Sequence, residues 1–203
     1  PDGSSSFTVL GFFVMSVRSF LTGAVLITLL SGCVSFSTPD LQQSWQGRFS
    51  ISAESAQHRE NHSGRFILTH SSAPLTILDL KTALGNTIAR ITLSDTDVSL
   101  QTVGRPEYRA DNVDNLLIQT LGFSVPVEGL QYWLEGSPIV GVSAQTTPQF
   151  KPYKEIRQNG WLIRYESYDT NGLPKRIRFE REASIDSPAL SILLLISDRH
   201  HVS

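Results

Sequence analysis

Cysteine and methionine are nearly missing from this chain, and so is any excess of positive charge. Cys33 is the single cysteine among 203 residues, so no disulfide can form within the chain. Lysine and arginine number 17 against 19 acidic residues, and they are scattered along the sequence. A surface that binds nucleic acid needs a surplus of basic side chains on one face. The composition therefore excludes nucleic acid as the main partner, and the length favours one domain plus a targeting segment.

Motifs of catalysis and metal binding are missing as well. His58 and His62 have a spacing that suits a metal site on a helix, but residues 54–63 are typical of a strand end and a loop. Neither Ser137 nor Ser143 lies in a GxSxG motif, and no GxxxxGK[ST] loop is present to bind a nucleotide. The sequence therefore predicts a protein without enzyme activity, metal or cofactor.

The first 32 residues are typical of an upstream extension plus a lipoprotein signal peptide. Arg18 precedes an apolar run over residues 20–30, which is shorter than the roughly 20 residues that span a bilayer. Polar residues also argue against one membrane helix over residues 7–30. The run ends in Leu30-Ser31-Gly32-Cys33, which resembles the lipobox of bacterial lipoprotein signal peptides. We expect Cys33 to become the first residue and to carry a covalent N-acyl diacylglycerol group.

Most of the remaining chain predicts β-strands. Apolar and polar residues alternate over residues 45–53, as on a half-buried strand. Asn159-Gly160 between two alternating runs predicts a hairpin. Residues 33–44 are expected to form the lipidated N-terminus, a tether and a short helix near residues 40–45, whereas residues 198–203 are expected to fray. The candidate strands cover residues 45–53, 64–70, 75–80, 87–93, 98–102, 150–157, 161–166, 176–180 and 189–196, the last covered on both faces.

Two predicted helices interrupt the strands. Residues 113–121 carry one apolar face after a possible cap in Asp111-Asn112, and Gly122 is a natural end. A second helix should begin at Pro126 and run through Glu135. A long antiparallel sheet curls, and its concave face can bury the apolar sides of both helices. The sequence thus predicts a mainly β domain over residues 45–203, an open half-barrel with a helical lid and an apolar interior.

Several segments resemble the LolB family of outer-membrane lipoprotein receptors. The most specific is the Gly, Pro, Val, Leu and Trp pattern of residues 122–138, which is similar to the family's pair of helices. Residues 161–169, Ala83-Leu84-Gly85 and Gly47-Arg48-Phe49 add weaker similarity. In the same order, the resemblance extends over residues 45–196.

The resemblance implies an incomplete antiparallel β-barrel of about eleven strands. Its apolar cavity would accept the acyl chains of lipoprotein cargo from the periplasmic carrier LolA and release them into outer-membrane lipid. An exposed leucine would aid this insertion, and Leu84, between Ala83 and Gly85, matches it. Val34, instead of Asp, follows Cys33, which implies sorting to the outer membrane. We expect a lipid-anchored monomer that faces the periplasm.

The lining of such a cavity and the filling of a core use the same residue types, so each candidate could serve either purpose. The candidates are Phe49, Ile51, Phe66, Leu68, Ile77, Ile91, Ile163, Tyr165, Ile192 and Leu194 on strands, and Leu117, Leu121, Leu130 and Trp133 on helices. The alternative function is a lipid-anchored envelope-assembly protein with a similar open barrel, which binds a protein partner instead of acyl cargo.

Overall fold

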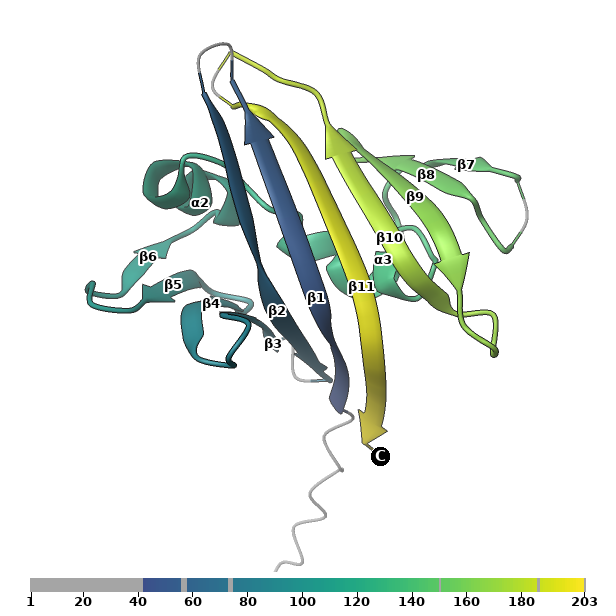
Figure 1. Ribbon diagram of the computed structural model, residues 1–203, viewed down its shortest axis with the longest axis horizontal. Helices are drawn as coiled ribbons and strands as arrows, with labels where there is room; N and C mark the ends of the chain where they lie inside the picture. The colour runs from purple at the N-terminus through teal and green to yellow at the C-terminus, as the bar shows by residue number, and fades with distance from the viewer. Residues whose placement is uncertain (1–41, 56–57, 73–74, 150, 186, 203) are drawn as a thin grey trace, which may run out of the picture. The chain divides into compact units, whose positions relative to one another are not determined.

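A computed structural model describes residues 42–55, 58–72, 75–149, 151–185 and 187–202. Within these residues, eleven strands form one antiparallel sheet in the order β6-β5-β4-β3-β2-β1-β11-β10-β9-β8-β7 (Figure 1). The strands are β1 (Gln42–Glu54), β2 (Arg59–Ser71), β3 (Leu75–Lys81), β4 (Thr87–Leu93), β5 (Val98–Thr102), β6 (Tyr108–Ala110), β7 (Gln145–Thr147), β8 (Glu155–Gln158), β9 (Trp161–Tyr168), β10 (Pro174–Arg181) and β11 (Ala189–Val202). The open antiparallel barrel expected from the sequence is confirmed.

The sheet is a meander in which the first and last strands of the chain, β1 and β11, pair at its centre. Each strand pairs with its sequence neighbours, and β1 also pairs with β11, from Gln42 opposite Val202 to Glu54 opposite Ala189. The two edges, β6 and β7, are therefore the strands that flank the helical segment, and the sheet stays open between them. This arrangement places the helices at the opening.

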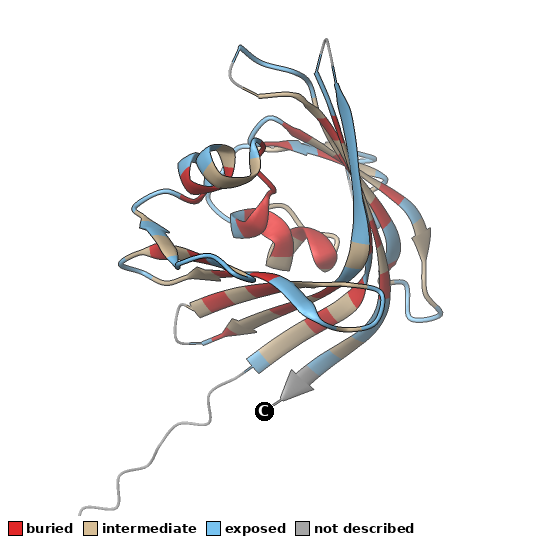
Figure 2. Cartoon of the chain, turned by 60° about the vertical axis from the view of Figure 1, so that its left-hand side comes forward, coloured by how far each residue is buried: buried red, intermediate tan, exposed pale blue. Residues whose placement is uncertain are grey.

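The helical segment contains α2 (Val113–Leu121), the short 3-10 helix η2 (Val127–Gly129) and α3 (Leu130–Leu134). The side chain of Asn112 caps α2 by accepting a hydrogen bond from the backbone N–H of Asn115 at 2.9 Å. Gly122 ends the helix with φ of 81°, a left-handed conformation that glycine adopts at little cost. Both predicted helices are confirmed, and they lie on the concave side of the sheet (Figure 2).

Three expectations about the ends of the domain are wrong. Residues 42–45 continue β1 and are not helical, because they pair with β2 and β11 at once, and the burial of Trp45 outweighs local helix propensity. The expected frayed end is also ordered, since β11 pairs with β1 through Val202. Finally, residues 189–196 are covered on one face only. Leu190, Ile192 and Leu194 are buried, whereas the residues between them are half-buried on the outer face.

At Gly47 the backbones of β1 and β11 leave no space for a side chain. A β-bulge lies between Gln46 and Gly47, and a Cβ atom at Gly47 would lie 2.1 Å from the backbone oxygen of Leu195. The two central strands could not keep this spacing around any side chain.

Replacing Gly47 with alanine should lower the free energy of unfolding by about 1–3 kcal/mol or more, as overpacking against backbone does. Urea denaturation followed by circular dichroism measures the loss. Ser50→Ala, at an exposed position of the same strand, is the matched control and should stay within about 0.5 kcal/mol of the unsubstituted protein. Equal stability of the two variants would contradict the close approach.

Candidate functional site

The concave side of the sheet and the helical segment together form one apolar core. Buried side chains from every strand except β6 and β7 contribute to this core, and so do α2, η2 and α3. In Figure 2 buried residues recur along the strands and on the helices that the curved sheet encloses. This interior, which the sheet shares with its helical cover, is the candidate functional site.

A small cavity lies in this core between the sheet and the helical segment. Its volume open to water-sized molecules is about 30 Å³. The lining is apolar throughout and consists of Phe49, Ile51, Phe66, Leu78, Leu80, Val125, Pro126, Leu130, Phe179, Ile192 and Leu194. Polar ligands would find no hydrogen-bonding side chain in this lining, so the cavity suits only an apolar guest.

The helical wall of the cavity has one firmly held part, α3. The indole Nε1 of Trp133 donates to Oε1 of Gln158 at 3.0 Å, and Gln158 in turn donates to the backbone oxygens of Ile139 and Val142 at 3.1 and 2.9 Å. The hydroxyl of Tyr165 donates to the backbone oxygen of Trp133 at 2.9 Å. Burial raises the pKa of the Tyr165 phenol far above its ordinary value, so this hydroxyl remains a donor.

The C-terminal end of α3 is tied to the central strands by charged groups. Glu135 accepts a hydrogen bond from the indole nitrogen of Trp45 on β1 at 2.5 Å. Arg199 on β11 donates to the backbone oxygen of Leu134 at 3.3 Å, and its guanidinium lies 3.7 Å from the Glu135 carboxylate and 3.4 Å from that of Asp169. The end of α3 is therefore fixed to both β1 and β11.

Val125 and Pro126 form the rest of the helical wall, and α2, which precedes them in the chain, is held differently from α3. In the part of the chain that the structure describes, the hydrogen bonds of α2 all stay within residues 112–124, including the one from Ser124 to Asp114. Its main contacts with the sheet are to β5 and β6, at one edge. Apolar packing alone therefore holds α2 against the sheet.

The structure sorts the predicted interior residues into three groups. Cavity-lining positions are Phe49, Ile51, Phe66, Leu130, Ile192 and Leu194. Other candidates fill the core around the cavity, namely Leu68, Ile91, Leu117, Trp133, Ile163 and Tyr165, with Leu121 half-buried against them. Ile77 is the one candidate that belongs neither to the cavity lining nor to the core.

Ile77 lies on the outer face of the sheet. It pairs with Thr69, whereas Leu78 and Leu80 pair with the buried Leu68 and Phe66. Both faces of β3 carry apolar residues, so alternation alone could not identify the inner one. The pattern also missed Val125, Pro126 and Phe179, of which the first two lie in an irregular segment with no period to detect.

Leu84 is displayed on the tight connection between β3 and β4. The backbone N–H of Thr82 donates to the oxygen of Asn86 at 2.8 Å, that of Gly85 donates to Thr82 at 3.0 Å, and Gly85 has φ of 94°. The side chain of Leu84 is 91% exposed. Because hydrogen bonds already order this loop, little further conformational entropy is lost when Leu84 contacts an apolar surface.

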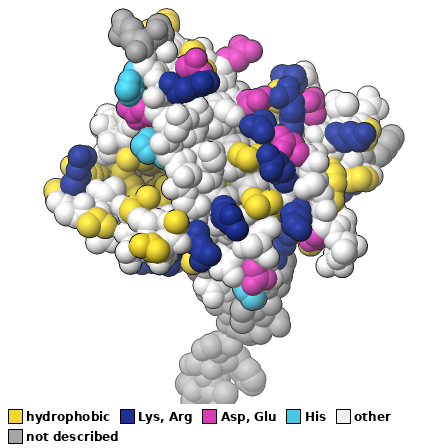
Figure 3. All heavy atoms as spheres, viewed as in Figure 1, with side chains coloured by type: hydrophobic (Ala, Val, Ile, Leu, Met, Phe, Trp, Pro, Cys, Tyr) yellow, Lys and Arg dark blue, Asp and Glu magenta, His cyan; other side chains and the backbone are white. Residues whose placement is uncertain are grey.

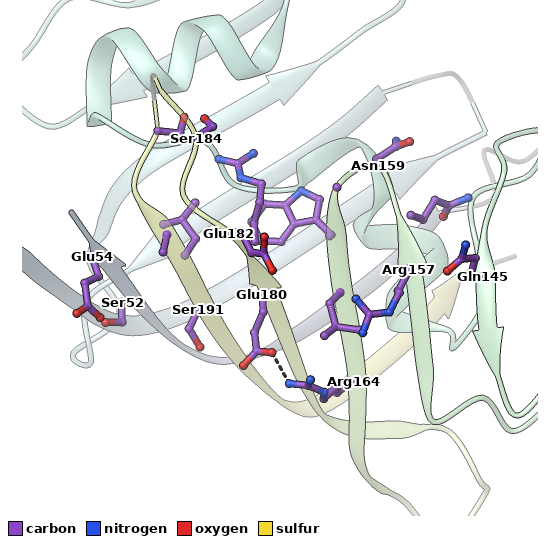
Figure 4. A pocket seen from close by; sticks show the side chains of 18 of the residues that line it. Ser52, Glu54, Gln145, Arg157, Asn159, Arg164, Glu180, Glu182, Ser184 and Ser191 are labelled. Carbon is purple, nitrogen blue, oxygen red and sulfur yellow. Dashed lines mark hydrogen bonds and ion pairs between the residues drawn. The ribbon is translucent and has the colours of Figure 1, made fainter. Parts of the chain in front are cut away.

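A second, larger depression of about 1150 Å³ runs over β8, β9 and β10, and it is polar (Figure 4). Arg164 lies between the carboxylates of Glu155 and Glu180 there, and Arg181 stacks over the ring of Trp161 at 4.8 Å. Arg59 pairs with Glu54 at the same depression, and exposed ion pairs of this kind are typical of a solvated surface.

The described residues contain no cluster of three or more His, Cys, Asp or Glu side chains that could hold a metal ion. No helix within the described ranges has the length and apolar character to cross a bilayer. Cys33, the predicted lipidation site, lies outside the described residues.

Fold and interior together define an open antiparallel β-barrel protein whose apolar cavity is covered by helices. The sequence pattern of the family "Outer membrane lipoprotein LolB" matches residues 42–198. The chain belongs to the LolB family, which places it among the outer-membrane lipoproteins.

Relatives named outer-membrane lipoprotein LolB support this membership. The relative from Cupriavidus necator is 32% identical over 77% of this chain and 80% of its own length. The relative from Thiobacillus denitrificans is 31% identical over 81% of this chain and 91% of its own length. A crystal structure of a LolA superfamily protein from Nitrosomonas europaea is similar with a TM-score of 0.45 and 13% identity, over 79% of this chain and 86% of that one.

Proposed function

We propose that this protein is a lipoprotein receptor of the outer membrane, which takes the acyl chains of lipoproteins from the periplasmic carrier LolA and passes them to the membrane. The observation that carries the proposal is the wholly apolar cavity between the sheet and its helical cover. Membership of the LolB family favours this receptor over an envelope-assembly protein without acyl cargo. We expect no catalytic step.

The energetics of acyl transfer fit a cavity of this kind. Each methylene exposed to water costs about 0.8 kcal/mol, so the chain must move from one dry site to another. Transfer between two such sites is nearly isoenergetic and needs no nucleotide. The membrane is the final acceptor, because it buries the whole acyl chain.

The cavity must widen before an acyl chain can bind. Its 30 Å³ leave space for on the order of one or two water molecules. We infer that α2 and residues 123–126 move outward, since apolar packing alone holds them, while α3 stays fixed through Trp133, Glu135 and Arg199.

A polar atom in the cavity wall should weaken acyl binding. Val125→Thr replaces a methyl group of the lining with a hydroxyl of similar size, and an unpaired buried hydroxyl costs about 1–3 kcal/mol. The dissociation constant of a fluorescent fatty acid should therefore rise by about five- to 150-fold. Fluorescence titration of residues 39–203, the compact unit that contains the whole core, measures it.

The matched control is Val113→Thr, which is equally buried but outside the cavity lining. It should keep the affinity of the unsubstituted protein, and thermal unfolding verifies that both variants fold. Absence of saturable fatty-acid binding by the unsubstituted protein would refute the receptor function, and equal affinities of the two variants would refute the assignment of this cavity.

We propose further that an acylated Cys33 anchors the protein in the outer membrane, facing the periplasm. One acyl chain gives only marginal attachment, whereas the three of an N-acylated diacylglycerol cysteine make it effectively permanent. The receptor function itself predicts that depletion of the protein in cells leaves lipoproteins bound to the periplasmic carrier.

A further inference from the structure

Three basic side chains lie side by side on the outer face of the sheet. Arg48 on β1 is directly opposite Arg65 on β2, and Arg65 is directly opposite Lys81 on β3. Directly opposed residues of an antiparallel pair have Cβ atoms about 4.5–5.5 Å apart. We call Arg48, Arg65 and Lys81 the basic triad.

The basic triad has no acidic partner among the described residues, unlike its neighbours. Arg176 and Arg178 on β10 share the carboxylate of Glu166 at 2.5 and 2.6 Å. The nearby Asp79 is held by Arg90 in two hydrogen bonds of 2.7 and 2.8 Å, and Asp198 is engaged by Gln46 and His200. Figure 3 shows Lys and Arg side chains on the outer face of the sheet, some of them beside acidic side chains and others not.

Opposed like charges destabilise a sheet, so the basic triad works against the fold. Polar uncharged residues would suit this exposed face better. An unfavourable charge arrangement on rigid strands is a reason to look for an anionic ligand.

The basic triad lines a groove that reaches the Leu84 connection. The groove has a volume of about 350 Å³, and its lining includes Arg48, Arg65, Lys81 and Gly85. Gly85 follows Leu84, whose side chain is 91% exposed. Val103 and Ile88, joined by a backbone hydrogen bond between β4 and the end of β5, are exposed as well. A basic groove therefore borders an apolar protrusion.

We propose that the basic triad binds the phosphate of an anionic phospholipid while Leu84 enters the acyl region beside it. Phosphate oxygens match the forked guanidinium donors of arginine, and a point charge such as Lys81 adds attraction. Adjacent basic and apolar groups fit the membrane surface, where phosphates lie next to acyl chains. An acidic protein would match the charges but would leave Leu84 without an apolar partner.

The test uses residues 39–203 and no acyl cargo, so it can fail independently of the proposed receptor function. Cosedimentation with phosphatidylcholine vesicles, with and without phosphatidylglycerol, measures partitioning. The unsubstituted protein should prefer vesicles with phosphatidylglycerol, and salt should weaken this preference. Arg65→Gln should reduce partitioning to them about fivefold, and the combined Arg48→Gln, Arg65→Gln and Lys81→Gln variant should remove the preference.

Arg157→Gln, which removes one exposed charge from β8, is the matched control and should keep the preference. Urea denaturation separates a binding defect from misfolding, because relief of like-charge repulsion should leave Arg65→Gln at least as stable as the unsubstituted protein. The proposal is overturned if the unsubstituted protein binds both vesicle types equally, as a surface for an acidic protein would, or if Arg157→Gln and Arg65→Gln lower partitioning alike.

Discussion

Replacing Trp133 with alanine is expected to lower the free energy of unfolding by about 3–5 kcal/mol, because the indole is buried and its removal leaves a cavity in the core. The ring packs on Phe179 with centroids 6.0 Å apart. The ring also lies so close to Gly129 that a Cβ atom added to Gly129 would be 2.4 Å from the nearest ring carbon. Its loss removes apolar contacts and leaves the amide of Gln158 short of one donor. Urea denaturation with circular dichroism measures the change.

Trp133→Phe separates the two contributions at this position. Phenylalanine keeps much of the apolar contact but cannot donate to Gln158, so a loss of about 1–3 kcal/mol is expected from the unmet polar group and the smaller ring. Because α3 forms part of the cavity wall, the alanine variant should also bind a fluorescent fatty acid with altered affinity. A loss below about 1 kcal/mol in Trp133→Ala would mean that α3 does not anchor the helical segment.

Leu84→Glu should slow delivery of acylated cargo into liposomes by about tenfold or more, since inserting a leucine into an apolar phase gains about 1.5–3 kcal/mol that a carboxylate cannot supply. Stability and acceptance of acyl chains should not change, because the side chain is 91% exposed and is not part of the cavity lining. A transfer assay from loaded carrier to protein, and then to liposomes, resolves the two steps.

Ile185→Glu provides the matched control for this charge. Ile185 is a fully exposed apolar residue on a different connection, between β10 and β11. The Ile185→Glu variant should deliver cargo at the rate of the unsubstituted protein. If both glutamate variants slow delivery equally, general charge repulsion from the membrane explains the effect and the assignment of Leu84 is refuted.

Local sequence patterns determined most of the secondary structure. Asn159-Gly160 forms the hairpin between β8 and β9, with φ of 51° and 75°, as the short-range signal predicted. Asn112 and Gly122 bound α2 because capping depends on a few neighbouring residues. The lipobox at Cys33 and the delivery role of Leu84 remain predictions that no part of the described structure tests.

What only the tertiary structure decided depends on pairing between distant strands. Residues 42–45 are strand because β2 and β11 lie on either side of them, and Ile77 faces outward because the register with β2 places Leu78 inside. The basic triad combines residues from three strands, which no local window brings together. Periodicity thus identified the strands, whereas register, a long-range property, decided which face of each strand became cavity, core or surface.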